Sequence, residues 1–220
     1  MTTSCSAGLF VTVEGIDGAG KTTQISKLKA ALENQGRQVC VTREPGGDEL
    51  GETVRHLLLS GTAVDRAELL LFLAARAQNT DRVIVPALQA GAIVLCDRYI
   101  DSSTAYQGYG RGLDPGHIEA LNTFATDALM PDITILLDIS PTTGLVRQSV
   151  HSAMEREGEQ FLTRVRQGFH TIAQNSAGRI VVLDAAIPVN DLHAQMLQLV
   201  NQRLSAKSAS GATVKRGVNI

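Results

Sequence analysis

Cysteine is scarce in this chain, and its cysteines are not spaced to act together. Cys5, Cys40 and Cys96 are the only three among 220 residues, and none forms a C-x-x-C pair with another. An odd, scattered set of this kind argues against a disulfide framework and against a structural zinc site. The histidines show no paired metal-ligand spacing either, so we interpret them as surface or helix residues.

A large excess of charge is also missing. The chain has 20 Lys and Arg residues against 22 Asp and Glu residues, a formal net charge of −2. This balance provides no broad surface for neutralising phosphates, so a dedicated nucleic-acid-binding protein is not favoured. With 44% hydrophobic and 19% charged residues, the chain can bury a sizeable core, which argues against a disordered protein.

Long apolar runs are absent too. No stretch reaches the roughly 18 apolar residues of a membrane span, and residues 1–8 contain neither the basic nor the apolar segment of a signal peptide. We therefore expect no membrane partner and a cytoplasmic location.

Five short apolar runs alternate with stretches of helical pattern. The runs are Leu9 to Glu14, Val39 to Arg43, Ala92 to Asp97, Ile133 to Asp138 and Ile180 to Asp184. Short apolar runs between helices are typical of buried parallel strands, and they predict a doubly wound α/β domain. Ligands of such a domain bind beyond the carboxyl ends of the strands.

The helical stretches and the chain ends complete the predicted organisation. Helices are expected over Thr22 to Asn34, as one long element over Asp65 to Gln89, and from about Val189 to Leu204. We predict a flexible N-terminus over residues 1–8, a single domain over 9–205 and a disordered tail over 206–220. The tail is rich in small and polar residues and has no acidic one.

A phosphate-binding motif follows the first predicted strand and opens the first predicted helix. The segment G-I-D-G-A-G-K-T matches G-x-x-x-x-G-K-[ST]. Glycines let backbone N–H groups turn toward phosphate oxygens, the lysine reaches the β and γ phosphates, and the hydroxyl can ligate Mg²⁺. The nucleotide-binding residues expected from it are Gly15, Ile16, Asp17, Gly18, Ala19, Gly20, Lys21 and Thr22.

Charged residues end two further strands at the expected ligand edge. Arg43 runs into a Glu-Pro-Gly-Gly turn, where its guanidinium is placed to meet an anion. Asp97 and Arg98 end the third strand and offer a carboxylate for Mg²⁺ or its water shell and a second phosphate-reading guanidinium. No N-K-x-D segment occurs, which disfavours a GTPase.

Several of these stretches together resemble the thymidylate kinase family. They are the phosphate loop, T-R-E-P-G-G at Thr42 to Gly47, F-x-A-A-R-x-Q at Phe72 to Gln78, D-R-Y at Asp97 to Tyr99, and Ala105 to Gly108. The resemblance spans roughly residues 9 to 204. It implies a five-stranded parallel sheet in a phosphate-loop NTPase fold like that of nucleoside monophosphate kinases, and a homodimer. It also implies that ATP, with Mg²⁺, donates its γ-phosphate to dTMP to give dTDP.

The resemblance also implies roles for individual residues. Phe72 would stack on thymine and Arg76 would bond the base, while Arg43 and Arg98 would hold the acceptor phosphate. Asp17 would approach the sugar hydroxyl or the metal, beside the metal residues Thr22 and Asp97. The residues that would complete the pocket are Ser102, Ser103, Tyr106 and Gln107, and the Tyr106 ring would leave little room for a ribose 2′-hydroxyl.

The lid expected over about residues 145–158 departs from the family pattern. Members with a glycine-type phosphate loop usually supply catalytic arginines from this segment, but here Q-S-V-H replaces the basic run. Arg147 matches the start of the lid and Arg156 is a substitute by proximity, so with Lys21, Arg98 and Asp17 they form the expected catalytic set. An arginine finger contributes orders of magnitude to phosphoryl transfer.

Three functions remain open at this point. The first is a dTMP kinase serving dTTP synthesis, and the second is a kinase for another nucleotide or deoxynucleoside. A nucleoside acceptor is disfavoured, because Arg43 and Arg98 would then have no acceptor phosphate. The third is a nucleotide-binding regulatory protein whose weakened lid no longer supports catalysis.

Overall fold

The computed structural model describes residues 8–147 and 158–210. Its centre is a parallel sheet of five strands in the order β2-β3-β1-β4-β5. The strands are β1 (Leu9–Glu14), β2 (Val39–Arg43), β3 (Ile93–Asp97), β4 (Ile133–Asp138) and β5 (Ile180–Asp184). The α/β fold, its parallel sheet and the strand positions expected from the apolar runs are confirmed, with β3 starting one residue later than predicted.

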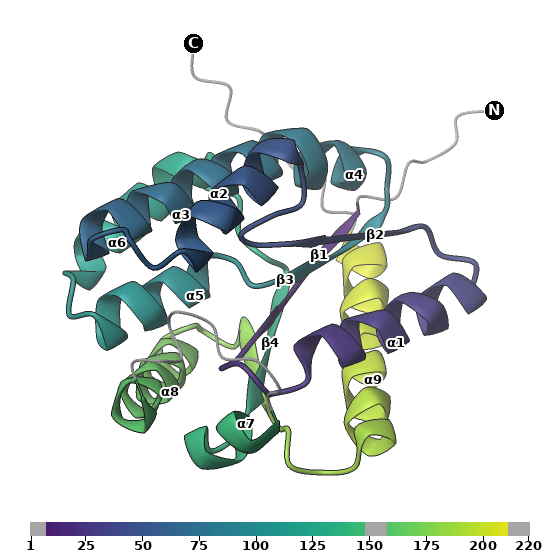
Figure 1. The fold of residues 1–220 in the computed structure, drawn as a ribbon. Helices are drawn as coiled ribbons and strands as arrows, with labels where there is room; N and C mark the ends of the chain where they lie inside the picture. The colour runs from purple at the N-terminus through teal and green to yellow at the C-terminus, as the bar shows by residue number, and fades with distance from the viewer. Residues whose placement is uncertain (1–7, 148–157, 211–220) are drawn as a thin grey trace.

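Helices cover both faces of this sheet (Figure 1). They are α1 (Lys21–Asn34), α2 (Glu49–Leu59), α3 (Asp65–Asn79), α4 (Val85–Gln89), α5 (Ile100–Ser103), α6 (Pro115–Thr126), α7 (Pro141–Arg147), α8 (Glu159–Gln174) and α9 (Val189–Ser210), with π-helical segments η1 (Thr80–Ile84) and η2 (Thr104–Gly110). Helices α1 and α9 lie side by side on one face, and the group from α2 to α6 lies on the other.

Alternation along β1 explains why both faces are covered. Leu9 and Val11 belong to the same buried cluster as Leu28 of α1 and Met196 of α9, whereas Phe10 packs in a second cluster with Ile84 of η1. Successive side chains of a strand point to opposite faces, so a strand that is apolar throughout needs helices on both sides. All six residues of β1 are buried accordingly.

The long helix predicted over Asp65 to Gln89 is helical throughout but changes its hydrogen-bond register. It consists of α3, the π-helical η1 and α4. Pro86 lies in the first turn of α4, directly after η1. The predicted long helix is therefore continuous, with π-helical hydrogen bonds at residues 80–84.

The predicted disordered tail begins too early. Helix α9 continues to Ser210, so residues 206–210 are helical rather than part of a tail. Lys207 holds this end to the body, because its Nζ donates to both carboxylate oxygens of Asp132 over 2.8 and 2.7 Å. Residues 1–7 and 211–220 lie outside the described part of the chain. None of the described helices is long and apolar enough to cross a membrane.

Candidate active site

The phosphate loop lies between β1 and α1, at the carboxyl end of the sheet. Gly15, Gly18 and Gly20 have positive φ angles of 139°, 79° and 88°. A Cβ atom at Gly18 would lie 2.2 Å from the carbonyl oxygen of Gly144, so a side chain has no room there. The loop therefore turns its backbone into the open N-terminus of α1, an arrangement that binds phosphate.

Lys21 folds back into this loop. Its Nζ donates to the carbonyl oxygens of Gly15 and Ile16 over 3.1 Å each and lies 3.5 Å from the Asp17 carboxylate. Burial lowers the pKa of Lys21, and the nearby Arg98 guanidinium lowers it further. Contacts within the protein thus hold the ammonium group at the loop.

Arg98 is the most highly connected charged residue at the carboxyl end of β3. It adopts a positive φ of 70°, an uncommon backbone conformation for a residue with a side chain. Its guanidinium donates to the Gly15 carbonyl over 2.9 Å, to Ser102 over 3.2 Å and to the Tyr106 hydroxyl over 3.3 Å, and pairs with the Asp17 carboxylate. These contacts fix one guanidinium between the phosphate loop and η2.

Asp97 and Thr22 lie together at the mouth of the loop, as a metal site requires. The Thr22 hydroxyl donates to Asp97 Oδ2 over 3.2 Å. Asp97 Oδ1 is buried and has no hydrogen-bond partner within the described residues, so it is an acceptor that a cation would satisfy. No cluster of three His, Cys, Asp or Glu ligands occurs among the described residues. This donor set fits Mg²⁺ shared with phosphates, which needs only one or two protein ligands.

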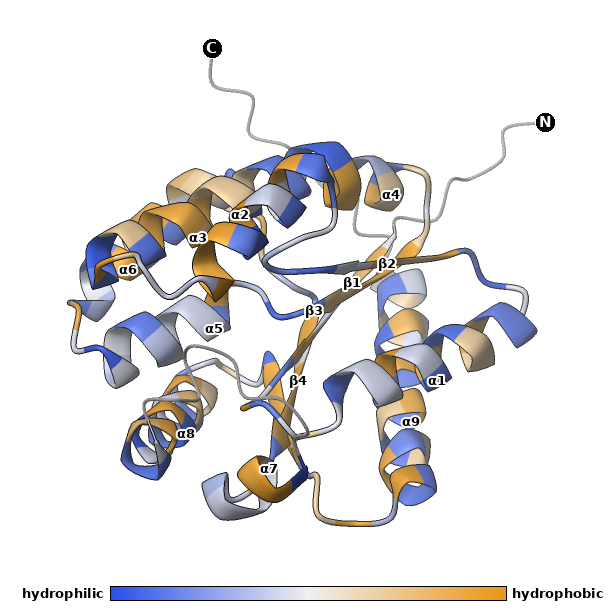
Figure 2. Ribbon diagram, viewed as in Figure 1, coloured by the Kyte–Doolittle hydropathy of each residue, from blue (hydrophilic) through white to orange (hydrophobic). Residues whose placement is uncertain are grey.

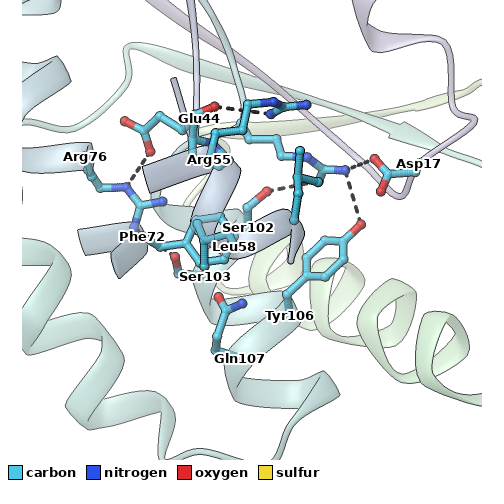
Figure 3. Close-up of a pocket in the computed structure, with 13 residues that line it drawn as sticks. Asp17, Glu44, Arg55, Leu58, Phe72, Arg76, Ser102, Ser103, Tyr106 and Gln107 are labelled. Atoms are coloured by element: carbon cyan, nitrogen blue, oxygen red, sulfur yellow. Dashed lines mark hydrogen bonds and ion pairs between the residues drawn. The ribbon is translucent and has the colours of Figure 1, made fainter. Parts of the chain in front are cut away.

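A cavity of about 730 Å³, its open mouth included, lies beside Arg98. The residues predicted for the acceptor pocket that line it are Asp17, Phe72, Arg76, Arg98, Ser102, Ser103, Tyr106 and Gln107. Figure 3 shows Phe72 and Arg76 on one side of it and Asp17 and Tyr106 on the other. We call it the acceptor cavity.

Arg76 is held rigidly at the wall of the acceptor cavity. It is 1% exposed, and its Nε donates to Glu44 over 2.7 Å. Burial raises the pKa of Glu44, and the charge of Arg76 opposes this rise in part. Further bonds go to Ser103 and Asn122 side chains and to the Tyr99 carbonyl. Few orientations are open to a guanidinium bonded on so many sides.

A second cavity contains the phosphate loop and the predicted metal residues. It is lined by Gly18 to Gln24, by Asp97 and by Arg147, whose Nη1 donates to the Ala185 carbonyl over 3.0 Å. We call it the nucleotide cavity. The two cavities share four lining residues and meet at them: Asp17, Glu44, Arg55 and Arg98.

Two predicted residues lie elsewhere or outside the described chain. Arg43 lines the nucleotide cavity rather than the acceptor cavity, and its half-exposed guanidinium pairs with both carboxylate oxygens of Glu52 over 2.9 Å. Arg156 and most of the predicted lid lie in residues 148–157, outside the described part. Asp138, at the end of β4, forms an ion pair with Arg166 over 2.7 Å.

Sequence reasoning missed one side of the acceptor cavity. This side consists of Glu44, Pro45, Arg55, Leu58 and Leu59. Arg55, Leu58 and Leu59 recur at three- and four-residue spacing, which puts them on one face of α2. That spacing was visible in the sequence, but which face of α2 looks toward Arg98 depends on tertiary packing.

Comparison with known proteins agrees with this geometry. The family model of thymidylate kinase matches residues 13–196. A thymidylate kinase of Solidesulfovibrio magneticus is 49% identical over 81% of this chain and 91% of its own length. One from Chlorobium luteolum is 43% identical over 91% of this chain and 100% of its own.

A solved structure shares the fold as well. The crystal structure of a thymidylate kinase from Ehrlichia chaffeensis has a TM-score of 0.74 and 37% sequence identity to this chain. The match covers 89% of this chain and 99% of that one. With the family model spanning most of the described residues, the chain belongs to the thymidylate kinase family.

Proposed function

We propose that this protein transfers the γ-phosphate of ATP to dTMP, giving dTDP and ADP for dTTP synthesis. One observation carries the proposal: the nucleotide cavity and the acceptor cavity meet at Arg98, Asp17 and Arg55. Phosphoryl transfer needs an acceptor in line with the γ-phosphate and positive charge around the transferred group. Two arginines at the junction of the cavities meet that need.

The donor side consists of the phosphate loop and Lys21. Backbone N–H groups of the loop hold the phosphates, and the Lys21 ammonium leaves the Gly15 and Ile16 carbonyls to meet the β and γ oxygens. Thr22 and Asp97, which contact each other, would hold the Mg²⁺ that accompanies ATP, and that ion would neutralise phosphate charge.

On the acceptor side, different residues bind the base and the phosphate of dTMP. Phe72 stacks on thymine and Arg76 bonds the base at one side of the acceptor cavity. Arg98 and Arg55 bind the phosphate at the junction, and Asp17 orients Arg98 and approaches the sugar hydroxyl. Arg43, on the nucleotide side, adds positive charge once it leaves Glu52.

The remaining positive charge comes from the lid. We assign the arginine finger to Arg156 or Arg147. Arg147 already lines the nucleotide cavity. A kinase for another nucleotide and a regulatory nucleotide-binding protein are both less favoured, because relatives named thymidylate kinase match over most of their length.

The proposal includes a homodimer and a cytoplasmic location. Support for the dimer comes from apolar side chains exposed on three neighbouring helices, Leu57 on α2, Leu70 on α3 and Phe124 on α6. These apolar side chains contact water in a monomer, whereas a second copy of the chain would bury them.

Product analysis tests the assigned reaction. The enzyme with ATP, Mg²⁺ and dTMP is expected to form dTDP and ADP in equal amounts, measured by anion-exchange chromatography. Lys21→Ala should lower turnover at least about 100-fold, since it removes a preorganised positive charge from the transferred phosphate. Formation of ADP without dTDP, or full turnover by Lys21→Ala, would refute the proposal.

A further inference from the structure

Glu68 is a buried carboxylate that the proposed reaction does not use. It lies on α3 behind the acceptor cavity and is 8% exposed, yet it does not line that cavity. Its Oε1 accepts a hydrogen bond from Nε2 of Gln107, over 2.9 Å. Gln107, in contrast, lines the cavity, so its hydrogen bond connects Glu68 to the cavity wall.

This contact fixes the orientation of the Gln107 carboxamide. A carboxylate offers only acceptors, so the NH₂ group of Gln107 must face Glu68 and the carboxamide oxygen must face away. Arg111 holds Glu68 in turn, because its Nη2 lies 3.1 Å from Oε2. Gln107 is 1% exposed, so its carboxamide cannot exchange Glu68 for bulk water.

The oxygen of Gln107 has no hydrogen-bond donor within the described residues, and it gives the cavity an acceptor. Arg76 supplies a complementary donor. A guanidinium has five N–H groups, and four from Arg76 bond Glu44, Ser103, Asn122 and the Tyr99 carbonyl, which leaves one Nη2–H for a ligand. Figure 3 shows Ser103 between Arg76, which comes from α3, and Gln107, which comes from η2.

An acceptor beside a donor matches one edge of thymine. Thymine offers N3–H as a donor next to O4 as an acceptor. Cytosine presents the opposite pattern, with N3 as an acceptor and an amino group at position 4. Against the Gln107 oxygen, cytosine N3 would place two acceptors face to face, and the buried groups would stay unpaired.

We propose that Glu68 is a positioning residue for base selectivity: it holds the Gln107 carboxamide in the orientation that accepts the N3–H of thymine and rejects cytosine. This inference rests on the proposed dTMP kinase activity. Arg111 supports the same orientation by holding the carboxylate from the other side.

The test is Glu68→Gln, which keeps the size of the side chain but lets residue 68 accept or donate. The Gln107 carboxamide can then turn over. We expect the ratio of kcat/KM for dTMP to kcat/KM for dCMP to fall at least about 10-fold. KM for dTMP should rise more than kcat falls, and KM for ATP should not change.

Asp65→Asn is the matched control. Asp65 is on the same helix and pairs with the same Arg111 over 3.3 Å, but it has no bond to Gln107. It should leave the selectivity ratio unchanged. The double variant Glu68→Gln/Gln107→Glu exchanges the two groups and presents a carboxylate oxygen to the base, so it should recover selectivity for dTMP.

Three results would overturn the inference. One is a folded E68Q variant in which kcat/KM falls equally for dTMP and dCMP, so that their ratio is unchanged. A structural role alone would produce this result. Another is loss of selectivity in D65N, and the third is a folded double variant that remains unselective. A wild-type enzyme that does not phosphorylate dTMP would instead remove the proposed function itself.

Discussion

Glu14 is a carboxyl group held in the core at the end of β1. It is 0% exposed and accepts hydrogen bonds from the Tyr99 backbone N–H over 2.7 Å and from the Ser102 hydroxyl over 2.6 Å. Ser102 also accepts from Arg98, so Glu14 supports the residue that joins the two cavities. Burial raises the pKa of Glu14 to about 7, and the charge of Asp101 adds to this effect, while Arg98 acts against it.

That raised pKa makes stability depend on pH. Between its ordinary value of 4.5 and about 7, Glu14 is ionised in the unfolded chain and protonated in the folded one. Unfolding then releases a proton, so the free energy of unfolding falls as pH rises through this range, by at most about 1.4 kcal/mol per pH unit from this group. The contribution is fully present below pH 4.5 and lost above pH 7.

Glu14→Gln should remove this pH dependence, because a carboxamide does not titrate. Urea unfolding at several pH values from 5 to 8 measures it. We expect the wild-type protein to lose stability relative to the variant as pH rises, and Asp132→Asn, a partly exposed carboxylate paired with Lys207, serves as the control. Parallel curves for wild type and Glu14→Gln would contradict the assigned pKa shift.

Residues within motifs were predictable, and residues brought in by packing were not. Phe72, Ser102 and Tyr106 line the acceptor cavity as expected, because motif and strand-end position together locate them. Arg55 was missed, since only the packing of α2 brings it to the junction. Arg43 was predicted to hold the acceptor phosphate but lines the nucleotide cavity, where its guanidinium pairs with Glu52 of α2.

At the scale of elements, α2, α3 and α6 form the surface assigned to the dimer. Helix α3 contacts both α2 and α6. Leu70 of α3 is 57% exposed and Phe124 of α6 is 88% exposed. Figure 2 shows hydrophobic residues along these neighbouring helices. Burying such side chains between two copies would stabilise the pair by about 25 cal/mol for each Å² of apolar surface removed from water.

Leu70→Asp should therefore split the dimer. Light scattering after gel filtration is expected to give twice the 23.4 kDa chain mass for the wild-type protein and a single chain mass for the variant. Val41→Lys is the control, since Val41 is a comparably exposed apolar residue on the edge strand β2, away from these helices. A monomeric wild type, or a dimeric Leu70→Asp that is folded, would count against this interface.

The five strands and three helical stretches followed from the sequence pattern, whereas two features of the helices did not. Apolar runs located all five strands, because strands buried on both faces leave little choice of residue. The register change at η1 was not predictable, since its residues fit an α-helix equally well. Helix α9 continues past residue 205, where Lys207 contacts Asp132, a residue 75 positions away in the chain.

The whole molecule brings ATP and its acceptor to one edge of the sheet. The phosphate loop follows β1, Glu44 follows β2 and Arg98 follows β3, and these are the adjacent strands at one side of the sheet. Parallel strands place their carboxyl ends at a common edge, so a donor site and an acceptor site share residues there. This shared junction should therefore select a nucleoside monophosphate as acceptor.

The most direct measurement is ADP formation from ATP and Mg²⁺ with dTMP, thymidine, dUMP, dGMP or dAMP as acceptor. We expect fast turnover with dTMP and much slower turnover with thymidine, because the nucleoside has no phosphate for Arg98 and Arg55. We also expect poor use of dAMP, because adenine presents an acceptor at N1 beside a donor at N6, the opposite of the thymine N3–H and O4 pattern. Equal rates with thymidine and dTMP would contradict this role of the junction. Tight binding of ATP and dTMP without turnover would contradict the proposed transfer.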